Sequence, residues 1–375
     1  MSGFDVVVIG LGAMGSATLY ALARRGVRVL GIERFTPGHD RGSSHGLTRI
    51  IRLGYFEHPS YVPLVREAIA LWRDIEARSG QSLMHVTGIL EVGPPDGVLV
   101  PGTLQSSRQH ALPHEILDAP GLMQRFPAFR VPPHFVGVFQ RDGGFLAAEA
   151  AMAAQLMLAR AAGAELRTEE TVCEIEPHAG RVRIVTDRGA VEAGATIVTA
   201  GPWLKTLLPG LPVPLKVTRQ ALGWFEPKDA ALFSASHFPV FILESNYGMH
   251  YGFPLFGEPG VKVGKHHHRD ETVDPDCHDR AVSDGDEALI RAALTEHLPA
   301  ASGRPIAAKT CLYTMTPDGN FVLDRLPGHP EIIIASPCSG HGFKFSPVIG
   351  ETLADLATSG ATQRDISRFQ ISRFE

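Results

Sequence analysis

The first 33 residues contain the feature that most constrains the fold. Val6–Ile9 is a short β-branched run that predicts a buried strand. A G-x-G-x-x-G motif follows it, with its glycines at Gly10, Gly12 and Gly15. Ser16–Arg25 predicts a helix, and Val27–Ile32 predicts a second strand that ends at Glu33. This order of strand, glycine turn, helix and strand is typical of a βαβ unit that binds a dinucleotide.

Each part of the motif has a physical role in dinucleotide binding. Gly10 allows the tight turn, Gly12 lets the backbone approach a pyrophosphate, and Gly15 lets the helix pack closely on the strand. The pyrophosphate binds at the helix N-terminus, where N–H groups are free and the dipole is positive. Glu33 can accept hydrogen bonds from ribose hydroxyls and disfavours a 2′-phosphate, which argues against NADP. The motif leaves FAD and NAD open; its N-terminal position favours FAD by analogy with flavoenzymes.

The amino-acid composition is that of an ordinary globular protein. The 375 residues predict about two domains, and 44% apolar with 20% charged residues supply a normal core. A net charge of −5 argues against a nucleic-acid surface. No run approaches the ~20 apolar residues of a membrane span, and no signal peptide is visible. The cysteines lack C-x-x-C spacing, which favours a reducing cytoplasm; they are Cys173, Cys277, Cys311 and Cys338.

The pattern of elements predicts an α/β chain with two interleaved domains. Ala195–Trp203 looks like a strand that returns beside the nucleotide, where Gly201 allows close approach. Ile332–Ala335 and the glycine turn after it look like a further return. We expect a discontinuous Rossmann-type FAD-binding domain made of residues 1–85, 145–215 and 312–375. A second, mostly antiparallel β-sheet substrate domain is expected from residues 86–144 and 216–311, with 83–144 built of short strands and loops.

Three regions outside the motif have more than one interpretation. Arg49 and Arg52 are three residues apart, so a helical turn would point both in one direction, while the simpler alternative is a solvated basic face. Cys311 by residue type alone is most often an inert, buried small side chain. Lys344 follows a glycine turn at a helix start, where a cation opposes the dipole. An anionic group held near Lys344 would offset that mismatch.

The segment from Val261 to His268 is the fourth ambiguous region. A regular strand places Lys262 and His266 on one face, and a buried Lys262 would need a reason to be there. His266 and His268 could bind a metal with Asp270, but no second ligand cluster is visible. We therefore predict polar residues at a strand end and no metal site.

Six stretches of the chain carry a resemblance to known flavoproteins. They are VVVIGLGAMGSATLYALARRG, GSSHGLTRIIR, YGFP, VKVGKH, KTCLYTMTPD and SGHGFKFSPVIGE. With these, the chain resembles the group of sarcosine oxidases and N-methyltryptophan oxidases, within the D-amino-acid-oxidase-like superfamily. The resemblance runs essentially from end to end, and its last three stretches are fairly specific to the group.

The resemblance implies roles for the residues that could carry chemistry. Cys311 matches the cysteine that bonds covalently to the 8α-methyl group of the flavin. Arg52 and Lys344 match a pair that binds the substrate carboxylate, for which an Arg fork and a Lys point charge are suited. Lys262 matches the lysine above the ring where oxygen is reduced. Tyr251 and His266 match residues of the substrate pocket with a binding or tuning role.

The resemblance also implies a wider cofactor site. His45 and Arg49 match basic residues beside the flavin ring, and Tyr313 matches a pocket residue near the attachment point. The remaining expected cofactor contacts lie in the matched glycine turns and polar loop; they are Ser44, Thr48, Gly201, Gly340 and Gly342. Two departures bear on the shape of the substrate pocket, namely Pro337-Cys338 before the glycine turn and the Lys265–His268 run.

The resemblance therefore implies a monomeric oxidase of secondary amino acids. The substrate carboxylate binds Arg52 and Lys344, the flavin takes a hydride equivalent, water hydrolyses the imine, and oxygen yields hydrogen peroxide. The substrate stays open between sarcosine, N-methyltryptophan, a cyclic imino acid and a bulkier compound. Two alternatives remain, a dehydrogenase that uses a non-oxygen acceptor and a non-catalytic flavin-binding module.

Overall fold

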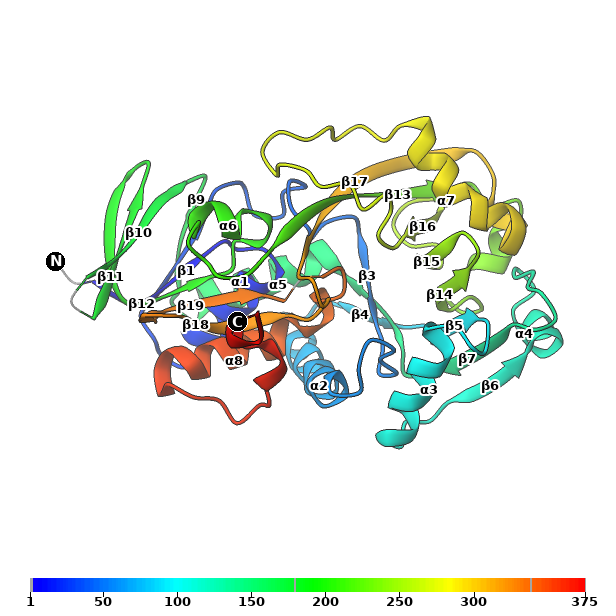
Figure 1. Ribbon diagram of the computed structural model, residues 1–375, viewed down its shortest axis with the longest axis horizontal. Coiled ribbons are helices and arrows are strands. Elements are labelled where there is room, and N and C mark those ends of the chain that lie inside the picture. The colour runs from blue at the N-terminus through cyan, green and yellow to red at the C-terminus, as the bar shows by residue number, and fades with distance from the viewer. Residues whose placement is uncertain (1–2, 179, 338, 375) are drawn as a thin grey trace.

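The computed structural model describes residues 3–178, 180–337 and 339–374; Cys338 lies outside the described residues. The molecule is elongated, with two sheet-containing halves side by side along its long axis (Figure 1). Two long strands, β13 (Lys216–Phe225) and β17 (Pro305–Met315), run between the halves. Within the described residues, no helix is long and apolar enough to cross a membrane.

The first half contains an eight-stranded sheet with the order β10-β11-β12-β1-β2-β9, extended by β19 and β18 beside β12. The strands are β1 Phe4–Ile9, β2 Val29–Glu33, β9 Glu165–Thr168, β10 Val172–His178, β11 Arg181–Thr186, β12 Gly189–Val198, β18 Val322–Leu326 and β19 His329–Ser336. The neighbours β19, β12, β1, β2 and β9 are parallel. Their carboxyl ends therefore meet at one edge of the sheet, where ligands bind in such folds.

The second half contains an eight-stranded sheet with the order β17-β13-β16-β15-β14-β5-β7-β6. Its other strands are β5 Ile89–Gly93, β6 Glu115–Asp118, β7 Val136–Gln140, β14 Val240–Ser245, β15 Gly248–Gly252 and β16 Val261–Lys265. All of its neighbours are antiparallel except β14 and β5. A small third sheet joins β3 Thr48–Ile51, β8 Gly144–Ala147 and β4 Met84–Val86. The division into two domains at the boundaries given above stays a prediction.

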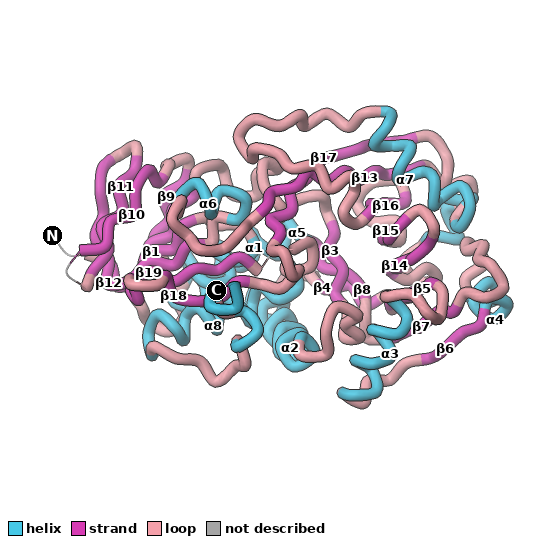
Figure 2. Tube along the Cα trace, viewed as in Figure 1, coloured by secondary structure: helices cyan, strands magenta, loops and turns pink. Residues whose placement is uncertain are grey.

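The helices are α1 Ala13–Ala23, α2 Tyr61–Ser79, α3 Leu99–Gln109, α4 Ala119–Arg125, α5 Ala148–Ala161, α6 Leu204–Leu207, α7 Asp284–His297 and α8 Ser346–Ser359. Four of them, α1, α2, α5 and α8, gather beside the first sheet (Figure 2). Their apolar side chains and the sheet share one core, which includes Leu19, Val65, Trp72 and Leu353.

Two expectations about local structure were wrong. Residues 83–144 contain the helices α3 and α4, which we expected as strands and loops, because Pro-Gly pairs in their first turns resemble loop signals. Proline is tolerated in the first turn of a helix, where its missing N–H has no partner to lose. Arg49 and Arg52 lie on and directly after strand β3, where an odd spacing sends side chains to opposite faces.

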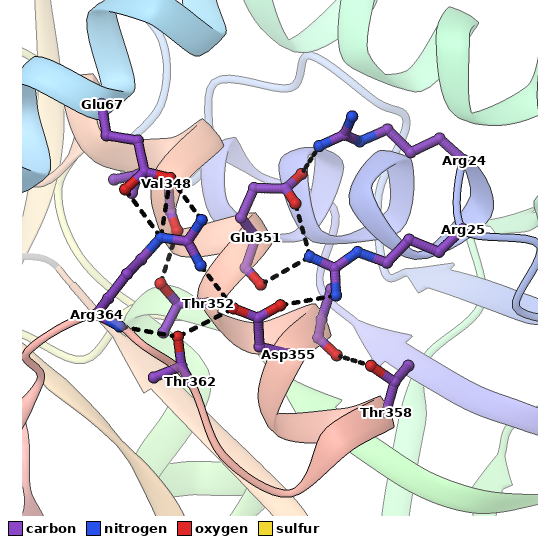
Figure 3. A network of polar contacts seen from close by, with 11 residues as sticks. Arg24, Arg25, Glu67, Val348, Glu351, Thr352, Asp355, Thr358, Thr362 and Arg364 are labelled. Carbon is purple, nitrogen blue, oxygen red and sulfur yellow. Dashed lines mark hydrogen bonds and ion pairs between the residues drawn. The ribbon is translucent and has the colours of Figure 1, made fainter.

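Paired charges fix the C-terminal helix to the dinucleotide helix. Glu351 of α8 accepts hydrogen bonds from Arg24 and Arg25, at 2.5 and 2.6 Å (Figure 3). Arg364 donates to Asp355 of α8 at 2.6 Å and to Glu67 of α2. The network ties α1, α2 and the chain after α8 together on the outer side of the first half.

Candidate active site

One cavity of about 430 Å³ connects the glycine motif to the paired cations predicted from the sequence. Its volume is in the range of pockets that hold small molecules and cofactors. The predicted site residues on its wall are Gly10, Gly12, Glu33, Ser44, Arg49, Arg52, Gly201, Tyr251, His266, Cys311, Tyr313, Gly340, Gly342 and Lys344. Four other predicted site residues do not line the cavity: Gly15, His45, Thr48 and Lys262.

Tight backbone contacts build the dinucleotide end of the cavity. Gly10 has φ +87°, and its N–H donates to Ile32 O at 2.8 Å, so the turn after β1 is held against β2. A Cβ atom at Gly15 would lie 1.8 Å from Gly10 O and 2.8 Å from Thr199 Oγ1. Only glycine at position 15 therefore permits this approach of helix α1 to the strands.

The start of helix α1 is open towards the cavity. Gly12 is the N-cap residue and supplies no side-chain cap, and the first turn carries no acidic residue. The Ala13 N–H donates to Ser44 Oγ at 3.3 Å, which brings the polar loop 35–46 beside the helix start. Free N–H groups and the helix dipole at this place suit a phosphate group.

Glu33 closes the same end of the cavity at the carboxyl end of β2. Its carboxylate accepts the Leu11 N–H at 2.7 Å and the Phe35 N–H at 2.9 Å. Burial raises the pKa of Glu33, but hydrogen bonds from His39 and these two amides outweigh burial and lower it. A carboxylate has about four acceptor sites, so the ionised Glu33 can still accept ribose hydroxyls.

The middle of the cavity lies beside Cys311 and Arg49. Cys311 sits in β17 opposite Gln220 of β13, and its side chain is buried. Burial raises the pKa of the Cys311 thiol, while Arg49 and Lys262 act to lower it. Arg49 Nη2 donates to Ser43 O at 2.8 Å and to His45 O. Arg49 thus shapes the loop around a cavity wall that carries positive charge.

Lys262 is a buried residue of strand β16 in the second sheet, and its side chain reaches the turn at 46–48. Its Nζ donates to Gly46 O at 2.6 Å, Thr48 O at 2.9 Å and Thr48 Oγ1 at 3.0 Å. An ammonium has three donors, so all of them are satisfied by the turn at 46–48. Burial, followed by the charge of Arg49, holds the pKa of Lys262 well below its usual value. The role of Lys262 in oxygen reduction stays a prediction.

Arg52 marks the far end of the cavity and already holds a carboxylate. Its Nη2 donates to both oxygens of Glu57 at 2.7 and 2.6 Å, and its Nη1 donates to Gly54 O at 2.7 Å. Arg52 is only 2% exposed, which excludes the solvated basic face considered from the sequence. Burial raises the pKa of Glu57, but the Arg52 charge prevails and brings it to about 2.

Lys344 and Arg52 lie over the same aromatic ring. Arg52 Cζ is 4.2 Å and Lys344 Nζ is 5.2 Å from the centre of the Tyr55 ring. Lys344 Nζ donates to His341 O at 2.7 Å. Burial, followed by the Arg52 charge, lowers the pKa of Lys344 to about 7. The structure brings Arg52 and Lys344 together at one end of the cavity, and their carboxylate-binding role stays a prediction.

His266, Tyr313 and Gly340 form one packed wall of the cavity. The rings of His266 and Tyr313 are 5.6 Å apart, and a Cβ at Gly340 would lie 2.6 Å from Tyr313 and 2.8 Å from His266. Burial, followed by the neighbouring His267, lowers the pKa of His266 to about 3, so its imidazole is neutral at pH 7. Burial raises the pKa of Tyr251, on the same cavity, to about 12.

Four polar residues at the far end escaped the sequence analysis. Tyr55 and His341 form a hydrogen bond of 2.6 Å between the phenol oxygen and Nδ1, and Glu57 and Glu91 both approach Arg52. Glu91 had a visible signal, because it is a charge within the apolar strand sequence ILEV. Glu57 had none, because its contact with Arg52 depends on an irregular turn.

The histidine run does not gather further acids around His266. His268 Nε2 lies 2.9 Å from Asp286 Oδ1, inside a structural ion cluster with Arg219. Among the described residues, no group of three His, Cys, Asp or Glu side chains is arranged to hold a metal ion.

The residues present fit FAD, the cofactor that the family resemblance implies. The glycine turn excludes side chains where the backbone must be approached, the start of α1 is uncapped, and buried Glu33 keeps free acceptor sites. The cavity then continues past Cys311 towards Arg52 and Lys344, so a dinucleotide and a small acid can lie end to end.

Comparisons with known proteins agree with this geometry. A family profile described as "DAO: FAD dependent oxidoreductase" matches residues 5–356. The monomeric sarcosine oxidase of Streptomyces avermitilis is 40% identical, over 99% of this chain and 97% of that protein. The N-methyl-L-tryptophan oxidase of Salmonella dublin is 36% identical, over 99% of both chains.

The solved structures include a relative with the same architecture. The open form of NikD, described as an unusual amino acid oxidase essential for nikkomycin biosynthesis, superposes with a TM-score of 0.87. It is 30% identical and covers 99% of this chain and 98% of that chain.

Proposed function

This chain belongs to the DAO family of FAD-dependent oxidoreductases, and from that premise we propose that it is an oxidase of N-methyl amino acids. In this reaction a secondary amine is oxidised to an imine, water hydrolyses the imine, and oxygen is reduced to hydrogen peroxide. The activities of the related sarcosine and N-methyl-L-tryptophan oxidases, as their names give them, support it. The observation that carries it is the pair Arg52 and Lys344, both over Tyr55 in the cavity that begins at the glycine motif.

Arg52 binds the substrate carboxylate by exchanging one carboxylate for another. Its Nη2 already pairs with both oxygens of Glu57, so the substrate has to displace Glu57 from that nitrogen. The Nη1 bond to Gly54 O keeps the guanidinium plane in place during the exchange. Because Arg presents a rigid fork of donors, the incoming carboxylate is oriented as well as bound.

Lys344 supplies the second charge for the same carboxylate. With a pKa of about 7, its ammonium form is only partly favoured in the free protein. A bound anion stabilises that form, because an opposite charge nearby raises the pKa of an amine. His341 O and Tyr55 Oη, at 2.7 and 3.4 Å from Nζ, hold the side chain in position.

Bound FAD supplies a two-electron acceptor for the amine. The chain's own part is to position that amine and to exclude water from it. Tyr251, Phe253 and Tyr313 line the same cavity as Cys311 and the paired cations. His266 is neutral on the same wall, so it places no positive charge against the substrate amine.

We further propose that Cys311 forms a thioether to the flavin. Its buried position on the cavity wall beside Arg49 and Lys262, which act to lower the pKa of its thiol, supports this attachment. Acid precipitation of the holoenzyme should leave the yellow colour in the protein pellet. Yellow colour in the supernatant would contradict the covalent link.

The second candidate is a dehydrogenase that passes electrons to a non-oxygen acceptor. It is favoured by Lys262, whose three donors are directed to the turn at 46–48 and not to the cavity. Substitution Lys262→Met separates the two functions: in an oxidase it slows reoxidation by oxygen about 100-fold or more while anaerobic reduction survives. An unchanged rate of reoxidation would show that Lys262 has no role in oxygen reduction.

We also propose that the protein is a monomer in the cytoplasm. The word "monomeric" in the name of the Streptomyces relative supports the first statement. Free Cys173, Cys277 and Cys311 among the described residues support the second, because a reducing compartment keeps thiols free. Sedimentation of the purified holoenzyme tests the monomer.

Anaerobic mixing with amino acids tests the reaction class first. The holoenzyme is mixed with sarcosine and N-methyl-L-tryptophan, and with glycine and tryptophan as matched controls that lack the methyl group. Bleaching of the flavin absorbance by an N-methyl compound and not by its control is the expected result. No bleaching by any N-methyl or cyclic amino acid contradicts the proposed function.

A further inference from the structure

Glu91 is a buried acid in a row of side chains that faces the substrate cavity. Its strand, β5, pairs with β14 so that Glu91 lies opposite Ile242, and Ile242 lies opposite Tyr251 of β15. Directly opposed residues on neighbouring strands share a face of the sheet. Ile242 and Tyr251 line the cavity, so Glu91 extends the same row behind the cavity wall, towards Arg52.

The carboxyl group of Glu91 makes no hydrogen bond of ordinary length and angle among the described residues, although the Thr103 hydroxyl faces it and acts to lower its pKa. Glu91 is 0% exposed, and neither of its oxygens has a partner; the same holds for Thr103 Oγ1 of α3. Arg52 Nη1 is 3.6 Å from Glu91 Oε1, which is too long for a hydrogen bond but close for two charges. An ionised carboxylate in this position is costly, so the environment favours the protonated acid.

The groups facing Glu91 come from three other parts of the chain. Arg52, Tyr55 and Glu57 follow β3, Lys344 precedes α8, and Thr103 lies on α3. Burial raises the pKa of Glu91 to about 7, although the Arg52 charge opposes the rise. Glu57 differs, because the charge of Arg52 brings its pKa to about 2 and keeps it ionised.

The charge balance of this cluster depends on the proton of Glu91. With Glu91 protonated, Arg52, Lys344 and Glu57 carry one net positive charge, which matches one substrate carboxylate. With Glu91 ionised and Lys344 in its ammonium form, the four groups together are neutral, and an incoming carboxylate leaves one uncompensated negative charge in a buried place. Buried uncompensated charge is strongly unfavourable.

We infer that Glu91 is a positioning residue that holds a proton when a carboxylate binds to Arg52 and Lys344, so that carboxylate affinity falls as the pH rises above neutrality. The inference rests on the proposed function, because it assumes that these two cations bind the substrate. Its sign follows from linkage: the form that binds best is the protonated one, which is present below the Glu91 pKa of about 7 and is lost as the pH rises through it.

Binding of methoxyacetate to the holoenzyme tests the inference without turnover. This anion has the shape of sarcosine but carries an ether oxygen in place of the amine, and the flavin absorbance change reports its binding. We expect the Kd of the unchanged protein to rise about tenfold from pH 6 to pH 8. In Glu91→Gln, which keeps the shape of the protonated acid, Kd at pH 8 should be tighter than in the unchanged protein, and the smaller rise that remains from pH 6 to pH 8 comes from Lys344, whose pKa is about 7.

Two further variants separate a proton switch from a structural effect. Glu91→Leu also removes the Glu91 carboxyl group and should show the same reduced dependence of Kd on pH, which keeps the test valid if one variant folds poorly. Glu57→Gln is the matched control: it removes a carboxylate that is ionised at both pH values and leaves Glu91 in place, so Kd should still rise from pH 6 to pH 8.

Several results would overturn the inference. One is a Glu91→Gln variant that keeps the wild-type dependence on pH. Another is weaker binding by that variant at pH 8, which would assign the titration to Lys344. A protein that is bleached by N-methyl amino acids yet binds methoxyacetate equally at both pH values also overturns it, and leaves the proposed function intact.

Discussion

The two ends of the cavity are built in different ways. At the dinucleotide end, backbone atoms of residues close in sequence make the surface: the glycine turn, the start of α1 and Glu33 all lie within the first 33 residues. At the substrate end, side chains from distant segments make it: Arg52 and Glu57, Tyr251, and His341 with Lys344. The dinucleotide end is a backbone surface that added side chains would obstruct. The substrate end is a cluster of buried charged side chains.

This difference determines how each end should respond to mutation. A backbone cradle fails by steric overlap, whatever the charge of the new side chain. A charge cluster fails when one member is removed and the others are left buried without compensation. The two ends should therefore lose different properties, namely cofactor retention at one and carboxylate binding at the other.

The largest expected effect is at the dinucleotide end. Gly15→Ala places a Cβ 1.8 Å from Gly10 O, so the helix must move away from the strand and the pyrophosphate site is lost. The purified variant should contain no flavin, as measured by the ratio of flavin to protein absorbance. Gly210→Ala, where the added Cβ has open space, is the control and should keep full flavin content. A normal flavin content in Gly15→Ala would show that cofactor binding does not depend on this close backbone approach.

The next effect is at the substrate end. Arg52→Met should lower kcat/KM for an N-methyl amino acid at least about 100-fold, because removing one partner of a buried charge pair costs about 3–5 kcal/mol. Flavin content should not change, since no dinucleotide contact depends on Arg52. Steady-state kinetics and absorbance measure the two properties, and a joint loss would show that the two ends are not separable.

A smaller effect is expected where the two ends meet. Cys311→Ser should release all flavin into the acid supernatant, while the native variant still binds FAD through the glycine turn. Its loss of kcat/KM should be less than that of Arg52→Met, because the carboxylate site is intact. A variant that no longer binds FAD at neutral pH would mean that the thioether, and not the backbone cradle, holds the cofactor.

The smallest effect is expected outside the cavity, in the network of Figure 3. Glu351→Gln weakens two ion pairs with Arg24 and Arg25, whose side chains are 34% and 27% exposed. Partly exposed pairs contribute up to about 1 kcal/mol, so Tm should fall by roughly 2 °C. Thermal unfolding measures this shift, and an effect on flavin content or carboxylate binding is not expected.

The local fold of the dinucleotide end was predicted well because its signals are adjacent in sequence. The strand, the glycine turn and the helix lie where Val6–Ile9, the motif and Ser16–Arg25 predicted them. Periodicity and glycine spacing act over one or two turns of chain, so they are readable without knowing the rest of the fold. The helices α3 and α4 were missed because their Pro-Gly pairs look like loop signals.

The residues of the substrate end could be named, but their physical state could not. The resemblance pointed to Arg52, Lys262 and Lys344, yet the sequence did not show that Arg52 is paired with Glu57 or that Lys262 donates to the turn at 46–48. These pairings depend on atoms that meet only after the sheets assemble.

By itself, the sequence determined the βαβ unit, the dinucleotide class of cofactor and the candidate cations. Only the tertiary structure decided that Glu91 lies unpartnered beside Arg52, and that burial shifts its proton affinity and that of Lys344 into the neutral range. The physical reason is that backbone shape follows from local residue types. Protonation depends on desolvation and on charges brought together from distant parts of the chain.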